Sequence, residues 1–222
     1  MKKVVITGAN RGIGLALVNE FLHANFYVIA TTRNHPTLLI EHPNLEWISL
    51  EITSEDSIEH AIKVIKTHHQ NIDLLINNAG VGVDLDQDIP QIDTIRNTFE
   101  VNVFGLINFT ERIIGSIIAG GTIFNISSVM GMLNRAEILP NATAYRMSKA
   151  ALNMYTKTLA ARLEPNHIRV VAIHPGWVQT DMGGEEADIT PETSAAGIYK
   201  LYTQSIESNS FWAAETQTKL NW

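Results

Sequence analysis

The sequence predicts a single α/β domain over residues 1–222: a doubly wound, mostly parallel sheet of about seven strands with helices on both faces. Short apolar runs alternate with amphipathic segments along the whole chain, which is typical of βαβ units. A glycine-rich turn follows the first apolar run. No linker, internal repeat or low-complexity segment divides the chain, and its length suits one hydrophobic core.

The expected strands are short apolar runs, several of them rich in Val and Ile. They cover residues 3–6, 27–30, 45–49, 74–76, 122–126 and 169–173. The expected helices lie between them, over residues 13–23, 55–68, 92–119, 143–163 and 191–202. Ser54 is a suitable N-cap for the second helix, and Thr190 followed by Pro191 suits the start of the last. The crossovers should be right-handed.

Composition and charge exclude several classes of protein. A formal net charge of −7 argues against a nucleic-acid surface, which needs a basic face. The chain has no cysteine, which rules out disulfide and thiol chemistry and fits a reducing compartment. The apolar run near the start breaks at Thr7-Gly8, so no signal peptide is expected, and no segment approaches the roughly 18 apolar residues of a membrane span. We therefore expect a soluble, cytoplasmic protein with no membrane partner.

The stretch VVITGANRGIGLAL predicts strand, glycine turn and helix. Gly8, Gly12 and Gly14 follow the spacing G-x-x-x-G-x-G. Glycines let a backbone approach a diphosphate, and a helix N-terminus offers free N–H groups and the positive end of its dipole. The alternative is a turn that merely needs glycine. Its place after the first strand favours dinucleotide binding and hence a Rossmann fold.

Two arginines favour NADP(H) over NAD(H). The second strand ends in Ala-Thr-Thr-Arg, where a cofactor without a 2′-phosphate would want an acidic residue for its ribose hydroxyls. Arg33 stands there instead, and Arg11 lies in the glycine turn, so both can meet a 2′-phosphate. The alternative is two solvated surface arginines.

Further motifs occur in a fixed order along the chain. They are TGANRGIG at 7–14, NNAG at 77–80, NVFG at 102–105, NISS at 125–128, YRMSK at 145–149 and HPGWVQTDM at 174–182. With them the chain resembles the short-chain dehydrogenase/reductase family over essentially its whole length. Within the family, the sequence around YRMSK and HPGWVQTDM is most similar to the small carbonyl-reductase branch, which includes sniffer-type and C-factor-like proteins.

The resemblance implies a catalytic tetrad of Asn102, Ser128, Tyr145 and Lys149. Tyr145 would donate or accept the proton, Ser128 would hold the substrate oxygen, and Lys149 would bind the nicotinamide ribose and lower the pKa of the tyrosine. Asn102 would steady a helix and a water chain. A free tyrosine has a pKa of about 10, so a nearby ammonium is needed to stabilise its phenolate. The i, i+4 spacing puts Tyr145 and Lys149 on one helix face. The alternative for Tyr145 and Lys149 is an ordinary pair on the surface of a helix. The alternative for Ser128 is Ser127.

The resemblance also implies a set of cofactor contacts. They are Gly8, Asn10, Arg11, Gly12, Ile13, Gly14, Arg33, Glu51, Ile52, Asn78, Ala79, Gly80, Tyr145, Lys149, Pro175, Gly176, Val178 and Thr180. Glu51 stands where the family often has an Asp that contacts adenine. Because the Glu side chain is longer, the sequence does not decide whether Glu51 makes that contact. Trp177 is expected either as a wall of the substrate pocket or as part of the core.

Several other polar residues are interpreted as structural. His174 is expected to be structural because a tyrosine already supplies the acid. No metal site is expected, since His68-His69 lacks partners and the acids of 84–88 are interpreted as a solvated loop. The segment 130–143 is longer than in many family members, and we hypothesise that it covers the substrate.

The sequence thus predicts an NADPH-dependent oxidoreductase that interconverts a small-molecule carbonyl compound and its alcohol. The alternative is a non-catalytic NADP-binding regulator or signalling protein on the same fold. Family members often pair through the helices corresponding to 92–119 and 143–163, so a homodimer is one of two expected states, the other being a monomer.

Overall fold

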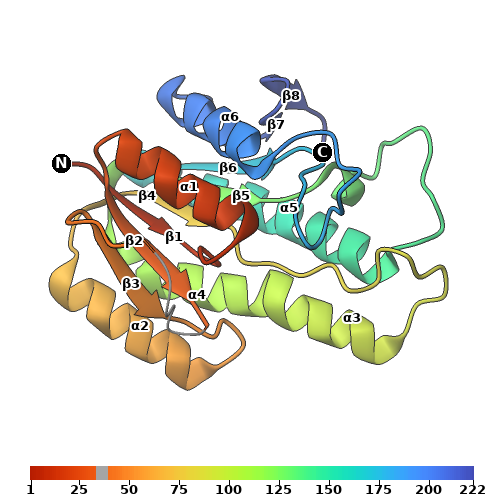
Figure 1. The fold of residues 1–222 in the computed structure, drawn as a ribbon, viewed down its shortest axis with the longest axis horizontal. Coiled ribbons are helices and arrows are strands. Elements are labelled where there is room, and N and C mark those ends of the chain that lie inside the picture. The colour runs from red at the N-terminus through yellow and green to blue at the C-terminus, as the bar shows by residue number, and fades with distance from the viewer. Residues whose placement is uncertain (34–39) are drawn as a thin grey trace.

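The computed structural model describes residues 1–33 and 40–222, which form a twisted sheet between two layers of helices (Figure 1). Within the described residues the sheet has eight strands in the order β3-β2-β1-β4-β5-β6-β7-β8. Neighbouring strands are parallel except for β7 and β8, which are antiparallel. The order reverses between β1 and β4, as a doubly wound sheet requires. The predicted fold class is confirmed.

The strands are β1 Lys3–Ile6, β2 Tyr27–Thr32, β3 Leu45–Ser49, β4 Ile72–Asn77, β5 Ile117–Ile126, β6 Arg169–His174, β7 Ser210–Ala213 and β8 Thr218–Leu220. The α-helices are α1 Gly12–His23, α2 Glu55–His68, α3 Ile92–Phe99, α4 Leu106–Ile113, α5 Thr143–Leu163 and α6 Pro191–Thr203. A π-helical segment, Glu100–Gly105, joins α3 to α4, and a short 3₁₀ turn, Val129–Gly131, follows β5. Ser54 and Thr190 cap α2 and α6 as predicted.

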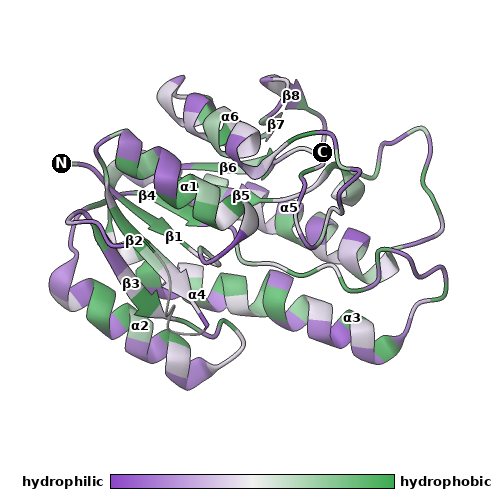
Figure 2. Ribbon diagram, in the orientation of Figure 1, coloured by the Kyte–Doolittle hydropathy of each residue, from purple (hydrophilic) through white to green (hydrophobic). Residues whose placement is uncertain are grey.

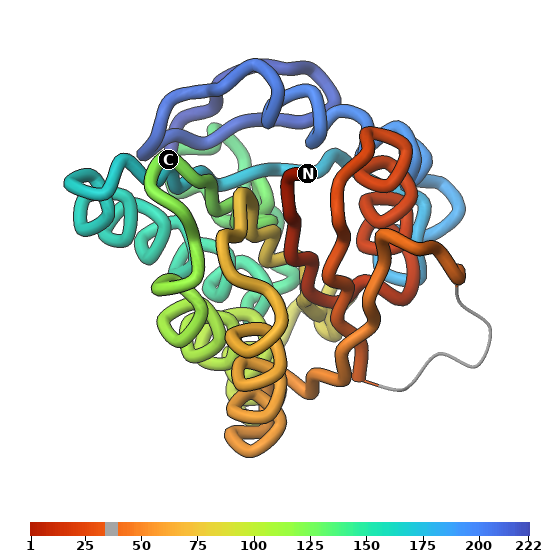
Figure 3. The backbone as a smooth tube through the Cα atoms, turned by 90° about the vertical axis from the view of Figure 1, so that its left-hand side faces the viewer, coloured from red at the N-terminus to blue at the C-terminus, as the bar shows by residue number. Residues whose placement is uncertain are grey.

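Each strand divides its side chains between two apolar cores, because successive residues point to opposite faces. Val4 and Ile6 pack with α1 and α6, whereas Val5 packs with α2, α4 and α5. Figure 2 shows the strands as largely hydrophobic, with polar residues on the outer helix surfaces. In Figure 3, α1 and α2 lie on opposite sides of the strands between them.

The prediction of one helix over residues 92–119 was correct in placing a helical segment there but wrong about its continuity and its end. The segment is broken by the π-helical turn and ends at a 3₁₀ turn, and β5 begins already at Ile117. Gly105 explains part of the irregularity: a Cβ there would lie 2.1 Å from the carbonyl oxygen of Ile52, so this turn packs directly on the chain after β3. β7 and β8 were not among the expected strands, because runs of four and three residues carry little periodicity.

Buried polar side chains join α4 and α5 to the carboxyl ends of β4 and β5. The Asn77 amide donates to Thr110 Oγ1 at 2.9 Å and to Asn125 Oδ1 at 2.8 Å. Asn125 in turn donates to Thr156 Oγ1 at 2.9 Å. A buried polar group is costly unless it is hydrogen-bonded, so this chain of contacts fixes where α5 sits on the sheet.

Thr156→Val should destabilise the protein by about 1–3 kcal/mol, because it leaves the Asn125 amide buried with one partner fewer. The matched control is Thr158→Val on the same helix, where the hydroxyl is exposed and bonds only to the helix backbone. Chemical denaturation of both variants measures the difference. Equal stabilities for the two would contradict the role given to the buried chain.

Candidate active site

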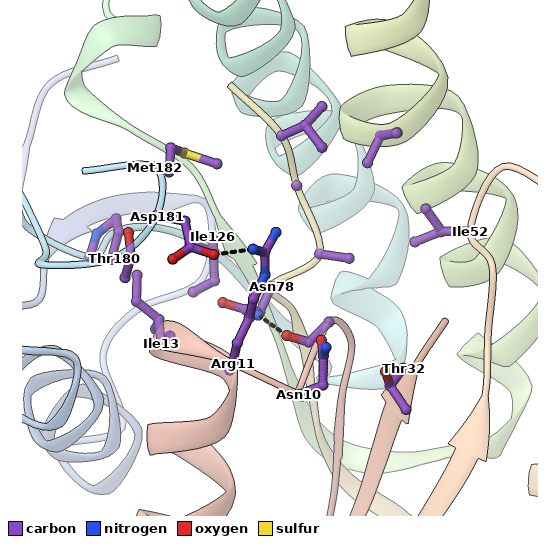
Figure 4. Close-up of a pocket in the computed structure, with 18 of the residues that line it drawn as sticks. Asn10, Arg11, Ile13, Thr32, Ile52, Asn78, Ile126, Thr180, Asp181 and Met182 are labelled. Atoms are coloured by element: carbon purple, nitrogen blue, oxygen red, sulfur yellow. Dashed lines mark hydrogen bonds and ion pairs between the residues drawn. The ribbon is translucent and has the colours of Figure 1, made fainter. Parts of the chain in front are cut away.

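A cavity of about 440 Å³ opens at the carboxyl edge of the sheet (Figure 4). The turn after β1, the ends of β2 to β6 and the start of α5 all contribute to its lining. Open α/β sheets bind ligands at this edge, where the strand order reverses. The volume falls in the range of small-molecule and cofactor sites, roughly 300–1,000 Å³.

Most of the predicted cofactor-contact residues line this one cavity. They are Gly8, Asn10, Arg11, Gly12, Ile13, Gly14, Arg33, Glu51, Ile52, Asn78, Ala79, Gly80, Tyr145, Lys149, Pro175 and Thr180. Gly176 and Val178 are not part of the lining. A Cβ on Gly176 would meet Ile189 Cδ1 at 2.5 Å, and Val178 is buried in a bridge with Ile189, so both pack inside the turn after β6.

The glycine turn has a backbone conformation and a close packing that require glycine. Gly8 and Gly12 have φ of +63° and +51°, a region that favours glycine. A Cβ on Gly14 would lie 2.2 Å from the carbonyl oxygen of Gly8. The Asn78 side chain donates to the carbonyl oxygens of Thr7 and Gly8 at 2.9 and 3.0 Å, which ties the turn to the end of β4.

The start of α1 fits the diphosphate of a dinucleotide. Its N-cap, Arg11, makes no side-chain cap hydrogen bond, so the first N–H groups of the helix are left for a ligand. Gly12 and Ile13 of this first turn line the cavity. A free helix N-terminus with its positive dipole end is a ready-made anion site.

Both candidate arginines have carboxylate neighbours. Arg11 forms an ion pair with Asp181, shown as a dashed line in Figure 4. Arg33 Nε lies 4.0 Å from Glu51 Oε2, while Glu51 Oε1 accepts hydrogen bonds from Thr53. The arginine side chains are about two thirds exposed, at 65% and 67%, so these pairs are weak and can be exchanged for a stronger anion.

Tyr145 lines the cavity, and Ser128 lies beside it without being part of the lining. The Ser128 hydroxyl opposes the effect of burial on the pKa of Tyr145, and its oxygen accepts a hydrogen bond from the N–H of Met130 at 3.1 Å. The alternative residue, Ser127, lines the cavity but donates its hydroxyl to Asn153 Oδ1 at 2.6 Å. The structure therefore pairs Ser128, rather than Ser127, with the tyrosine, as strand alternation allows for only one of them.

Lys149 lies beside Tyr145, one helical turn away, and is only 5% exposed. Its ammonium nitrogen donates to the carbonyl oxygen of Ile126 at 2.8 Å and is 5.5 Å from the centre of the Tyr145 ring. Burial lowers the pKa of Lys149 to about 8, because a buried ammonium is poorly solvated.

Among the chain's own residues, burial dominates the pKa of Tyr145. Burial raises the pKa of Tyr145 to about 12, and the Ser128 hydroxyl only partly opposes it. Desolvation of the phenolate therefore outweighs any help from Lys149, whose nitrogen is engaged with the Ile126 carbonyl. Tyr145 keeps its proton at neutral pH.

Asn102 lies in the π-helical segment and is fully buried. It clamps the backbone of Val81, accepting from its N–H and donating to its carbonyl oxygen, both at 2.8 Å. It also donates to Ser148 Oγ at 3.0 Å. Asn102 thus joins the chain after β4 to α5 and, together with Lys149, borders Gly80.

The interpretation of the acids at 84–88 as a solvated loop was wrong for Asp84. Its side chain is buried and accepts hydrogen bonds from the backbone N–H groups of Ala144 and Tyr145. Asp86 and Asp88 are exposed. Sequence reasoning also missed Asp181, whose partner Arg11 lies far away in the chain.

His174 and Trp177 lie near the end of β6. Burial, followed by the positive charge of Arg135, lowers the pKa of His174 to about 4, so the ring is neutral at physiological pH. The Trp177 side chain donates to the Gly183 carbonyl oxygen, and the residue is 49% exposed, which excludes it from the core.

None of the helices in the described part of the chain is both long enough and apolar enough to cross a membrane.

Comparison with solved structures supports the carbonyl-reductase branch. The NADPH-bound carbonyl reductase from chicken fatty liver superposes with a TM-score of 0.91 at 30% identity, covering 100% of this chain and 99% of that one. Carbonyl reductase Sniffer of D. melanogaster superposes with a TM-score of 0.89 at 28% identity and full coverage of both chains.

Sequence comparison gives the same family. An oxidoreductase of Schizosaccharomyces pombe is 34% identical over 182 residues, which cover 80% of this chain and 61% of the relative, so the chain spans about three fifths of that protein's length. The short chain dehydrogenase model matches residues 2–189. With the glycine turn, the fold and the Ser128–Tyr145 pair in place, the chain belongs to the short-chain dehydrogenase family.

Proposed function

We propose that the protein is an NADPH-dependent oxidoreductase that interconverts a carbonyl compound and its alcohol, with Tyr145 as the proton donor in reduction. One observation carries the proposal: Tyr145 lies beside Ser128 and buried Lys149, and it lines the same cavity as the glycine turn. The NADPH-bound chicken reductase, similar over the whole chain, supports both the cofactor and the reaction class.

The cofactor would be held along the cavity by elements already described. The glycine turn and the first N–H groups of α1 would bind the diphosphate. Backbone at Ala79 and Gly80 would line the adenosine side, and Pro175 and Thr180 the nicotinamide side. Gly176 and Val178 would contribute through backbone only, because their side-chain positions face the interior of the turn.

The chain's own residues would handle the proton and the developing charge. When bound, the nicotinamide would supply the hydride and, once oxidised, a positive charge. Tyr145 donates its proton to the substrate oxygen, and Ser128 donates a hydrogen bond to the same oxygen as negative charge develops there. Lys149, when protonated, stabilises the phenolate that remains. In the reverse direction that phenolate accepts the proton.

The candidate partner is thus a small carbonyl compound or alcohol.

Phe104 and Met154 are exposed at 55% and 59% on the helices expected to pair in a homodimer. Light scattering would decide between a monomer and a dimer.

Tyr145→Phe should abolish reduction, with a loss of at least about 10²–10⁴-fold, because the substrate oxygen loses its proton donor. The measurement is NADPH absorbance against a panel of quinones, aldehydes, ketones and diketones. Tyr155→Phe is the matched control, since that hydroxyl bonds Glu111 outside the cavity. Turnover retained by Tyr145→Phe excludes the assigned donor. Tight NADPH binding by a wild-type protein with no turnover would favour the non-catalytic regulator.

Arg33→Ala should reduce the preference for NADPH over NADH by about 10- to 100-fold, the worth of one charge-assisted contact to phosphate. Dissociation constants for both cofactors, measured by calorimetry, give the ratio. Arg96→Ala is a suitable control because Arg96 pairs only with Asp93 on the surface of α3. An unchanged ratio of the NADPH and NADH dissociation constants would mean that Arg33 is a solvated surface residue that does not contact the 2′-phosphate.

The value of kcat/KM for NADPH should fall as the pH rises through about 8, the pKa of Lys149, because the neutral amine no longer stabilises the phenolate. Lys149→Arg is the matched variant, since its guanidinium stays charged, and its remaining activity should show no such decline. A flat wild-type profile up to about pH 9 would contradict this role for Lys149.

A further inference from the structure

Helix α5 carries Tyr145 in its first turn but has no cap of its own. Its N-cap position is Ala142, which has a φ of +60° and no side chain that can accept a hydrogen bond. The first N–H groups of a helix need partners from elsewhere. The structure supplies them from a loop about sixty residues earlier in the chain.

Asp84 provides the missing cap. Its Oδ2 accepts a hydrogen bond from the N–H of Ala144 at 2.7 Å, and its Oδ1 accepts one from the N–H of Tyr145 at 3.3 Å. The residue is only 3% exposed. One carboxylate thus holds the backbone of the tyrosine itself and of the residue before it.

The rest of this loop is fastened to the same turn of α5. The N–H of Ala142 donates to the carbonyl oxygen of Gln87 at 3.1 Å, and the Asn141 amide donates to that of Leu85 at 2.7 Å. A Cβ on Gly82 would lie 3.3 Å from Tyr145 Cδ2, so the backbone of this loop passes close to the tyrosine ring. In Figure 1 the yellow segment after β4 runs beside the start of α5 on its way to α3.

A buried carboxylate is expensive unless it is hydrogen-bonded and close to positive charge. Here it meets the positive end of the α5 dipole. The Arg146 guanidinium, which bonds to Asn141, also interacts with Asp84: burial and the charge of Arg135 lower the pKa of Arg146, and the charge of Asp84 opposes them. Its burial and its two hydrogen bonds to the first turn of α5 make Asp84 a specific anchor of this helix.

We propose that Asp84 is a positioning residue for Tyr145: its carboxylate fixes the first turn of α5 and thereby holds the tyrosine hydroxyl against Ser128. The expected effect on turnover rests on the proposed function, whereas the effect on the position of the ring does not. Asp84 acts through Tyr145 and lies outside the cavity lining.

The test uses Asp84→Asn, which keeps the size of the side chain but replaces one acceptor oxygen by a donor. The protein is labelled with 3-fluorotyrosine, and the fluorine resonance of Tyr145 is assigned as the one missing from Tyr145→Phe. Asp88→Asn removes an exposed charge from the same loop and is the control. Asn141→Ala loosens the same attachment without touching a buried charge, so the test survives if Asp84→Asn does not fold.

Asp84→Asn should shift or broaden the Tyr145 resonance and lower kcat about 10- to 100-fold, while the NADPH dissociation constant stays within about twofold. Asn141→Ala should act in the same direction, and Asp88→Asn should change neither. An unchanged Tyr145 resonance overturns the inference, whatever happens to turnover, and so does an unchanged kcat in an active enzyme. If the wild type reduces no carbonyl compound, the proposed function fails, and the fluorine spectrum still decides whether Asp84 positions the ring.

Discussion

The attachment of α5 to the carboxyl end of β5 is the constraint on which the candidate site depends. Three polar side chains of the helix make it: Lys149 to the Ile126 carbonyl, Asn153 to Ser127, and Thr156 to Asn125. Spacings of four and three residues place all three on one helix face. Tyr145 lies one turn further toward the N-terminus, so its position is determined by this row of buried contacts and by what holds the first turn.

Burial favours the neutral forms of both Tyr145 and Lys149. It raises the pKa of Tyr145 to about 12 and lowers the pKa of Lys149 to about 8. The tyrosine therefore keeps its proton at neutral pH and is a weak acid on its own. In the proposed reaction, release of this proton would depend on positive charge close to the phenolate, so catalysis and cofactor binding would be coupled through electrostatics.

The sheet, the glycine turn and the cavity could be predicted because each rests on local pattern: apolar runs, glycine spacing and the rule for parallel strands. The burial of Asp84 could not, since its partners are about sixty residues away. The same holds for Asp181 beside Arg11, and for the π-helical segment Glu100–Gly105, where Gly105 packs closely on Ile52. The effect of burial on the pKa of Tyr145 could not be predicted either, because desolvation depends on the finished packing rather than on the spacing to Lys149.

If the cavity at the carboxyl edge binds a dinucleotide and favours NADPH, calorimetric titration of the purified protein with NADPH, and then with NADH, will show it. We expect one NADPH bound per chain, with weaker binding of NADH because Arg11 and Arg33 then lack a phosphate to meet. Failure to bind either nucleotide would contradict the assignment of the cavity and, with it, the proposed function.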